Sequence, residues 1–134
     1  MAGRKTLQKS CSIEGYGIHS GTFCKLIFSP CDAGSGIRFH HDSFSSPICV
    51  HPSSIGSINR ATSLSLEGDT VYTPEHLLGA CCGTGIWDLD IFLEGGLEIP
   101  ILDGSALDFV DLFLQTGLKE DAMRTDPIVF DQPL

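Results

Sequence analysis

The chain has 134 residues, of which 42% are hydrophobic and 19% are charged, and its net charge at pH 7 is −9. These values predict one globular domain with a hydrophobic core. The acidic balance argues against nucleic acid as a partner, and no apolar run is long enough for a transmembrane segment. The first residues do not resemble a secretory signal, so we expect a cytoplasmic protein with six reduced cysteines.

Short apolar runs separated by glycine, proline and polar residues predict a series of strands. The first ends at the glycine turn 15–17, and the last places Trp87, Leu89, Ile91 and Leu93 on one side. The predicted strands are 6–14, 23–29, 36–40, 48–51, 61–66, 70–72 and 87–94.

A helix is predicted over 74–82, because Thr73 is a good N-cap and Pro74 suits the first helical position. Glu75 and His76 then lie in its first turn, where the helix dipole favours a carboxylate and a neutral imidazole. A neutral imidazole can bind a metal ion, and a neighbouring carboxylate can accept a proton from water. Spacing alone leaves the plainer interpretation open, namely a capped helix with a surface acid and a surface histidine.

A second helix is predicted after Asp103-Gly104-Ser105, and Gly117 ends it. Its apolar residues recur with helical spacing and define one buried stripe. Several strands with two helices predict an α+β fold. We expect a two-layer sandwich, with a mainly antiparallel sheet and both helices packed on one face. The predicted stripe consists of Ala106, Phe109, Val110, Phe113 and Leu114.

Two further polar residues are candidates for a site. His19 lies in a glycine-flanked loop, where the backbone can approach a ligand closely. A loop histidine without a role is the alternative. Asp103 has a plain structural interpretation as a helix cap.

Four motifs occur in order along the chain, and together they resemble the UDP-3-O-acyl-N-acetylglucosamine deacetylase family, the zinc amidases of lipid A biosynthesis. The resemblance extends over residues 6–118. The motifs are Thr6-Leu7, Gly15-x-Gly17-Ile18-His19-x-Gly21, Thr73-x-Glu75-His76-Leu77-Leu78 and Glu98-Ile99-Pro100-Ile101-Leu102-Asp103-Gly104-Ser105-Ala106.

The resemblance implies a zinc-dependent hydrolysis of the substrate N-acetyl group, with Glu75 as general base and His76 as a Zn2+ ligand. His19 and Asp103 would line the site. Members of the family have two similar α+β domains with the active site between them, and this sequence matches the first. The implied division is one domain at 1–122, with 123–134 as a linker or the start of a second domain.

In the family, the second domain supplies an H-x-x-x-D pair that completes the zinc site. No such pair follows His76 in this sequence. We therefore expect an incomplete Zn2+ site, an inactive isolated chain, and a second deacetylase domain as partner in cis or in trans. The apolar run 127–130 would be the first strand of that domain. Two alternatives remain, a non-catalytic binding domain that retains the fold and an unrelated α+β domain.

Overall fold

The structure, a computed structural model, describes residues 3–51 and 63–124. Its main sheet has five strands in the order β2-β3-β8-β4-β5. The pair β4–β8 is parallel and the other three pairs are antiparallel. The bounds of these strands are β2 Cys11–Tyr16, β3 Phe23–Ser29, β4 Ile37–His40, β5 Ile48–Cys49 and β8 Leu89–Gly95.

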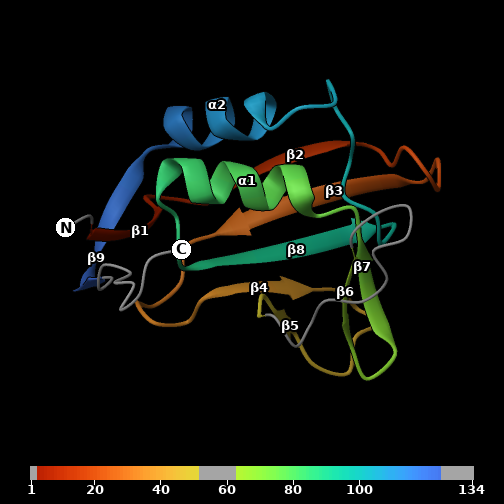
Figure 1. The fold of residues 1–134 in the computed structure, drawn as a ribbon, viewed down its shortest axis with the longest axis horizontal. Helices are drawn as coiled ribbons and strands as arrows, with labels where there is room; N and C mark the ends of the chain where they lie inside the picture. Colours follow the sequence, from red (N-terminus) through yellow and green to blue (C-terminus); the bar gives the residue numbers. More distant parts are fainter. Residues whose placement is uncertain (1–2, 52–62, 125–134) are drawn as a thin grey trace, which may run out of the picture.

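Two antiparallel strand pairs flank this sheet (Figure 1). One pairs β1 (Gly3–Leu7) with β9 (Leu118–Arg124), which come from opposite ends of the described chain. The other is the hairpin of β6 (Ser63–Leu66) and β7 (Asp69–Tyr72). This hairpin leads directly into the first helix.

The helices α1 (Glu75–Thr84) and α2 (Leu107–Thr116) lie side by side on one face of the sheet (Figure 1). Phe28 of β3 contacts two rings of α2 edge to face, with ring centroids 6.4 Å from Phe109 and 5.1 Å from Phe113. All three phenylalanines are fully buried. The predicted α+β sandwich with both helices on one face is thus confirmed.

The predicted strand 6–14 is wrong in its extent, because the structure has two strands there. Residues 8–10 between them are exposed. β1 turns away from the main sheet to pair with β9, and the Gln8 N–H donates to the Gly117 carbonyl at 2.9 Å. The polar segment 8–10 is therefore a connection between two sheets.

The prediction that Trp87 lies on the same side of a strand as Leu89, Ile91 and Leu93 is also wrong. The Trp87 side chain is 51% exposed, whereas Leu89, Ile91 and Leu93 are buried as predicted. β8 begins only at Leu89, and the Trp87 N–H donates instead to the Lys5 carbonyl at 2.9 Å. Trp87 thus belongs to the connection from α1 to β8, which hydrogen-bonds to β1.

Neither helix begins as predicted. Pro74 occupies the N-cap of α1 without a side-chain hydrogen bond, because Thr73 has a left-handed backbone with φ of 58° and its hydroxyl is engaged elsewhere. α2 begins at Leu107, whose N–H donates to the Ser105 hydroxyl at 3.1 Å. Asp103 therefore does not cap α2 directly.

The buried stripe of α2 is narrower than predicted. Phe109 and Phe113 are fully buried, and Ala106 and Val110 are half-buried against the core. Leu114 is 57% exposed, because it lies on the side of the helix that faces away from the sheet.

β9 continues past residue 122, so the strand includes residues 123 and 124 on the far side of the predicted domain boundary. The division into domains stays a prediction, and the apolar run 127–130 lies outside the described residues. Neither α1 nor α2 has the length and apolar character that crossing a bilayer requires.

Candidate functional site

Three of the four candidate residues lie at the starts of the two helices. Glu75 is exposed and His76 is half-buried in the first turn of α1, and Asp103 is exposed in the turn before α2. The Ser105 backbone N–H and hydroxyl hold the pKa of Asp103 below its usual value, and the charge of His76 acts in the same direction. His76 and Asp103 are therefore within electrostatic reach of each other.

The fourth candidate, His19, is tied to this region through its backbone. Its side chain is exposed, whereas its N–H donates to both carboxylate oxygens of Glu98, at 3.2 and 3.3 Å. The loop itself is closed by hydrogen bonds from Gly17 N–H to the Thr22 carbonyl and from Gly21 N–H to the Gly17 carbonyl. The structure thus fixes the backbone of His19 and leaves its imidazole open to solvent.

Glu98 is a residue of the site region that sequence reasoning missed. It is 1% exposed, and its carboxylate accepts hydrogen bonds from Ser20 N–H at 2.8 Å, Ser20 Oγ at 2.7 Å and Thr73 Oγ1 at 2.8 Å. Burial acts to raise the pKa of Glu98, but these donors and His19 outweigh burial and hold it below the usual value. The sequence contains Glu98 in its longest motif, but it carries no local signal for partners so far away.

A cavity of about 690 Å³ adjoins this carboxylate. Of the four candidate residues, only His19 lines it. Glu75, His76 and Asp103 do not line it, so this cavity and the predicted chemistry meet only at the His19 loop. The lining consists of His19, Ser20, Thr22, Tyr72, Thr73, Gly96, Leu97 and Glu98.

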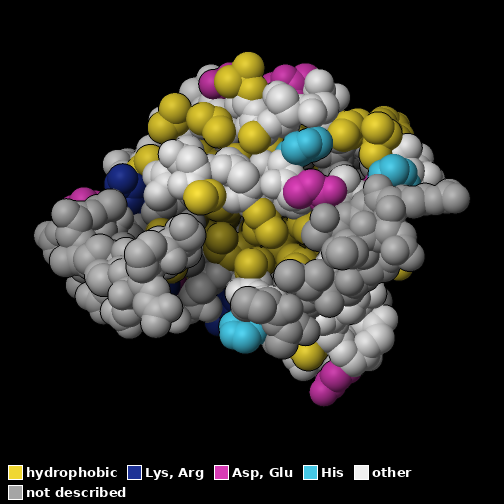
Figure 2. All heavy atoms as spheres, viewed as in Figure 1, with side chains coloured by type: hydrophobic (Ala, Val, Ile, Leu, Met, Phe, Trp, Pro, Cys, Tyr) yellow, Lys and Arg dark blue, Asp and Glu magenta, His cyan; other side chains and the backbone are white. Residues whose placement is uncertain are grey.

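The helical layer is only partly covered on its outer side. Leu107 and Leu114 of α2 are each 57% exposed, and Leu78 of α1 is half-buried. Figure 2 shows hydrophobic side chains along this layer and in a hollow beneath it. A second cavity, of about 410 Å³, is lined in part by Leu78, Cys81 and Trp87. The face near Glu75 and His76 therefore includes apolar surface that another body could cover.

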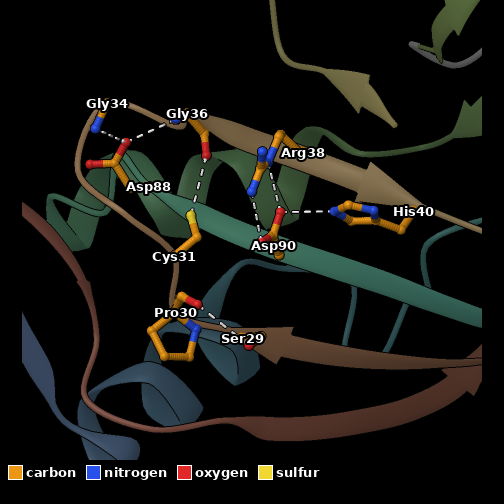
Figure 3. Close-up of polar contacts among 9 residues, drawn as sticks. All are labelled: Ser29, Pro30, Cys31, Gly34, Gly36, Arg38, His40, Asp88 and Asp90. Atoms are coloured by element: carbon orange, nitrogen blue, oxygen red, sulfur yellow. Dashed lines mark hydrogen bonds and ion pairs between the residues drawn. The ribbon is translucent and has the colours of Figure 1, made fainter. Parts of the chain in front are cut away.

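A second group of acidic residues holds the strands together. Asp88 is fully buried and accepts hydrogen bonds from Arg4 at 2.7 Å and from the Gly34 and Gly36 N–H groups at 3.1 and 2.9 Å. Figure 3 shows Asp88 pointing toward these two glycines. Burial and the neighbouring Asp88 carboxylate raise the pKa of Asp121, on β9, to about 6.

Asp90, on β8, makes a separate cluster with Arg38 and His40 (Figure 3). Its carboxylate accepts two hydrogen bonds from Arg38, at 2.8 and 2.9 Å, and lies 2.8 Å from His40 Nε2. The His40 ring in turn stacks on Phe92 at a centroid distance of 4.4 Å. These contacts join β4 to β8. They give the polar groups of Arg38, His40 and Asp90 hydrogen-bond partners within the protein, so the cluster does not require a ligand.

The zinc ion implied by the resemblance does not fit the described residues by themselves. A catalytic zinc site has three protein ligands and one open position. Residues 3–51 and 63–124 contain no group of three His, Cys, Asp or Glu side chains arranged to hold a metal ion. The described residues by themselves therefore show no zinc site.

Comparison with known proteins gives a consistent match. The family model described as UDP-3-O-acyl N-acetylglycosamine deacetylase matches residues 4–134. The UDP-3-O-acyl-N-acetylglucosamine deacetylase of Brucella melitensis biotype 2 (strain ATCC 23457) is 36% identical over 124 residues, and that of Brucella ovis (strain ATCC 25840 / 63/290 / NCTC 10512) is 35% identical. Each alignment covers 90% of this chain but 43% of the relative. The chain thus spans less than half the length of these relatives.

Proposed function

The chain belongs to the UDP-3-O-acyl N-acetylglycosamine deacetylase family, and from that premise we propose that it carries the first part of a deacetylase site. The substrate is UDP-3-O-acyl-N-acetylglucosamine, and the reaction is hydrolysis of its N-acetyl group in lipid A biosynthesis. The observation that carries this proposal is the first turn of α1, where Glu75 is exposed and His76 is half-buried, and where the charge of His76 acts on the pKa of Asp103.

Glu75 is the general base in this proposal. Hydrolysis of the acetamide requires a water oxygen to form a bond to the carbonyl carbon, while the bond from that carbon to nitrogen breaks. Glu75 accepts the proton of the water and returns a proton to the departing amine, so that acetate and a free amino group result. Its exposed position on the outer side of α1 gives a substrate access to the carboxylate.

Zinc dependence is part of the proposal, with His76 as one ligand. The other ligands come from a second deacetylase domain, in cis or in trans, because the described residues lack a set of three. The partly apolar outer face of the helices supports such a neighbour, since Leu107 and Leu114 are more than half exposed there. The described part of the chain alone is therefore inactive.

The test measures acetate release from UDP-3-O-acyl-N-acetylglucosamine in the presence of zinc. The chain alone is compared with a fusion to the part of the Brucella melitensis relative that this chain does not match. We expect no turnover from the chain alone, and turnover from the fusion that Glu75→Gln and His76→Ala both abolish. Glu14→Gln, which removes an exposed carboxylate of β2, is the matched control and leaves turnover unchanged.

Two results would contradict this assignment. Turnover by the chain alone that depends on Glu75 would refute its incompleteness. A folded fusion that binds zinc but releases no acetate would favour the alternative, a binding domain that retains the fold without catalysis.

A further inference from the structure

Glu98 stands out among the buried groups of the molecule because its negative charge is held entirely by neutral donors. The ion pairs of the described residues involve Asp88 and Asp90 but not Glu98. Its partners are two backbone N–H groups and two hydroxyls, from His19, Ser20 and Thr73. Hydrogen bonds to a charged acceptor are roughly twice as strong as neutral ones.

The number of these donors argues against a direct chemical role for the carboxylate. A carboxylate has about four lone-pair positions. Oε1 accepts from His19 N–H, Ser20 N–H and Ser20 Oγ, and Oε2 accepts from Thr73 Oγ1 and, more weakly, His19 N–H. Its acceptor capacity is therefore used within the protein, in contrast to the exposed Glu75.

The donors come from two segments that lead to candidate site residues. Ser20 and His19 belong to the glycine loop, and Thr73 lies two residues before Glu75. The backbone reinforces the second contact, because Tyr72 N–H donates to the Leu97 carbonyl at 2.9 Å and Ile99 N–H donates to the Tyr72 carbonyl at 3.0 Å. One side chain thus links the His19 loop to the entry of α1.

The loop is also shaped to admit this carboxylate. A Cβ atom at Gly17 would overlap Glu98 Oε1 and would lie 2.8 Å from Ser20 Oγ. Only glycine leaves the space that the carboxylate occupies there. The sequence of the loop and the position of Glu98 are therefore mutually dependent.

We infer that Glu98 is a positioning residue of the proposed deacetylase site, which holds the His19 loop and the turn at Thr73 in register so that His19, Glu75 and His76 face one reaction space. This inference rests on the proposed function for its catalytic consequence. The coupling of the two segments through the Glu98 carboxylate does not depend on the proposed function and can be tested without measuring turnover.

The first experiment tests the coupling in the chain itself by amide NMR and hydrogen exchange. Glu98→Gln keeps the shape and one acceptor oxygen, whereas Glu98→Ala removes all acceptors. We expect the His19 and Ser20 amide protons to move upfield in Glu98→Gln, and their exchange to quicken at least about tenfold in Glu98→Ala. The amide signals of Glu75 and His76 shift in both variants. Glu94→Gln, an exposed carboxylate on the neighbouring strand, is the control and leaves these signals in place.

The second experiment measures kcat and KM in the fusion described above. Displacement of reacting groups by about 1 Å can lower the rate about 100-fold. We therefore expect a loss of kcat of about 100-fold in Glu98→Ala and a smaller loss in Glu98→Gln, with KM changed less than about threefold. Partial retention by the conservative Gln variant distinguishes positioning from a requirement for the charge alone.

The two experiments separate the failure of this inference from the failure of the proposed function. If Glu98→Gln is folded and the His19, Ser20, Glu75 and His76 signals are unchanged, the coupling does not exist and the inference is overturned. If those signals move but kcat stays at the wild-type value, the positioning role is overturned. If the unsubstituted fusion is inactive, the proposed function fails, and the NMR result still decides whether Glu98 couples the two segments.

Discussion

The two helices of this protein begin in similar ways but are held by different contacts. Thr73 before α1 and Leu102 before α2 both have left-handed backbones, with φ of 58° and 52°. A residue other than glycine in this conformation costs about 1–2 kcal/mol. Neither helix has a side-chain hydrogen bond at its N-cap. Each entry therefore depends on contacts outside the helix itself.

Those contacts are buried and distant for α1, and exposed and local for α2. Thr73 donates to the buried Glu98, 25 residues away, whereas Ser105 N–H and Oγ donate to the exposed Asp103, two residues away. Water competes for the exposed hydrogen bonds to Asp103 but not for the buried hydrogen bond to Glu98. The contrast indicates that substitutions at the α1 entry will disturb distant segments, whereas those at the α2 entry will stay local.

The largest expected effect comes from filling the space beside Glu98. Gly17→Ala places a methyl group against the carboxylate, and we expect a loss of about 3 kcal/mol in the free energy of unfolding. Gly79→Ala is the matched control, because a Cβ there meets nothing within 4 Å and alanine favours a helix by about 0.5–1 kcal/mol. Urea denaturation of both variants checks this pair. Equal stabilities would mean that the loop yields to the methyl group and that Glu98 is not closely confined.

A smaller effect is expected at the other end of the same contact. Thr73→Val retains the shape and the β-branch but removes the hydroxyl, and we expect it to lower the free energy of unfolding by about 1–2 kcal/mol. Thr73→Ser keeps the donor and should stay within about 0.5 kcal/mol of the wild type. Thermal unfolding measures the difference. A Val variant as stable as the Ser variant would show that the backbone hydrogen bonds alone hold this entry.

Acid titration sharpens the contrast between buried and exposed carboxylates. The pKa of Glu98 is below 4.5 in the folded protein, so its stabilising contribution is present above pH 4.5 and is lost as the pH falls through the folded pKa. The stability difference between wild type and Glu98→Gln should therefore be constant above about pH 6 and should shrink below 4.5. Other carboxylates titrate equally in both proteins and cancel. A difference that does not vary between pH 3 and pH 7 would contradict an ionised Glu98.

The smallest effect is expected on the open side of the helices. His76→Ala should change the free energy of unfolding by no more than about 0.5 kcal/mol, because the imidazole is half-buried and α1 is fixed by Leu77 and its entry turn. Ser105→Ala should leave the α1 entry intact and loosen only the turn before α2. Thermal unfolding of both variants checks these expectations. Unfolding of the chain by His76→Ala would identify His76 as a core residue and remove it from the proposed site.

Local patterns predicted much of this fold. The alternation in β3 and the apolar spacing around Phe109 and Phe113 depend on neighbouring residues, and such patterns identify strands and helices directly. The glycine loop and the first turn of α1 were also visible as motifs. The deacetylase family was recognised from those motifs, and the match over residues 4–134 confirms it.

Long-range contacts account for what local patterns could not predict. Thr73 has a side chain suited to an N-cap, but its hydroxyl donates a hydrogen bond to Glu98, 25 residues later. Residues 6–14 have the pattern of a single strand, but Thr6 and Leu7 pair with β9 in another sheet. In both cases a partner far along the chain overrides the local preference, and a single sequence contains no signal for that partner.

The pairing of β1 with β9 has a consequence for the order of folding. Its ladder joins Leu7 to Leu118 and Gly3 to Arg124, so nearly the whole described chain forms the enclosed loop. The entropy lost on closing a loop grows with its length, and contacts of long sequence separation slow folding. The β2–β3 hairpin closes a far shorter loop. We therefore expect the hairpin and the helical core to form first. The β1–β9 pair should form last, after that core is already packed.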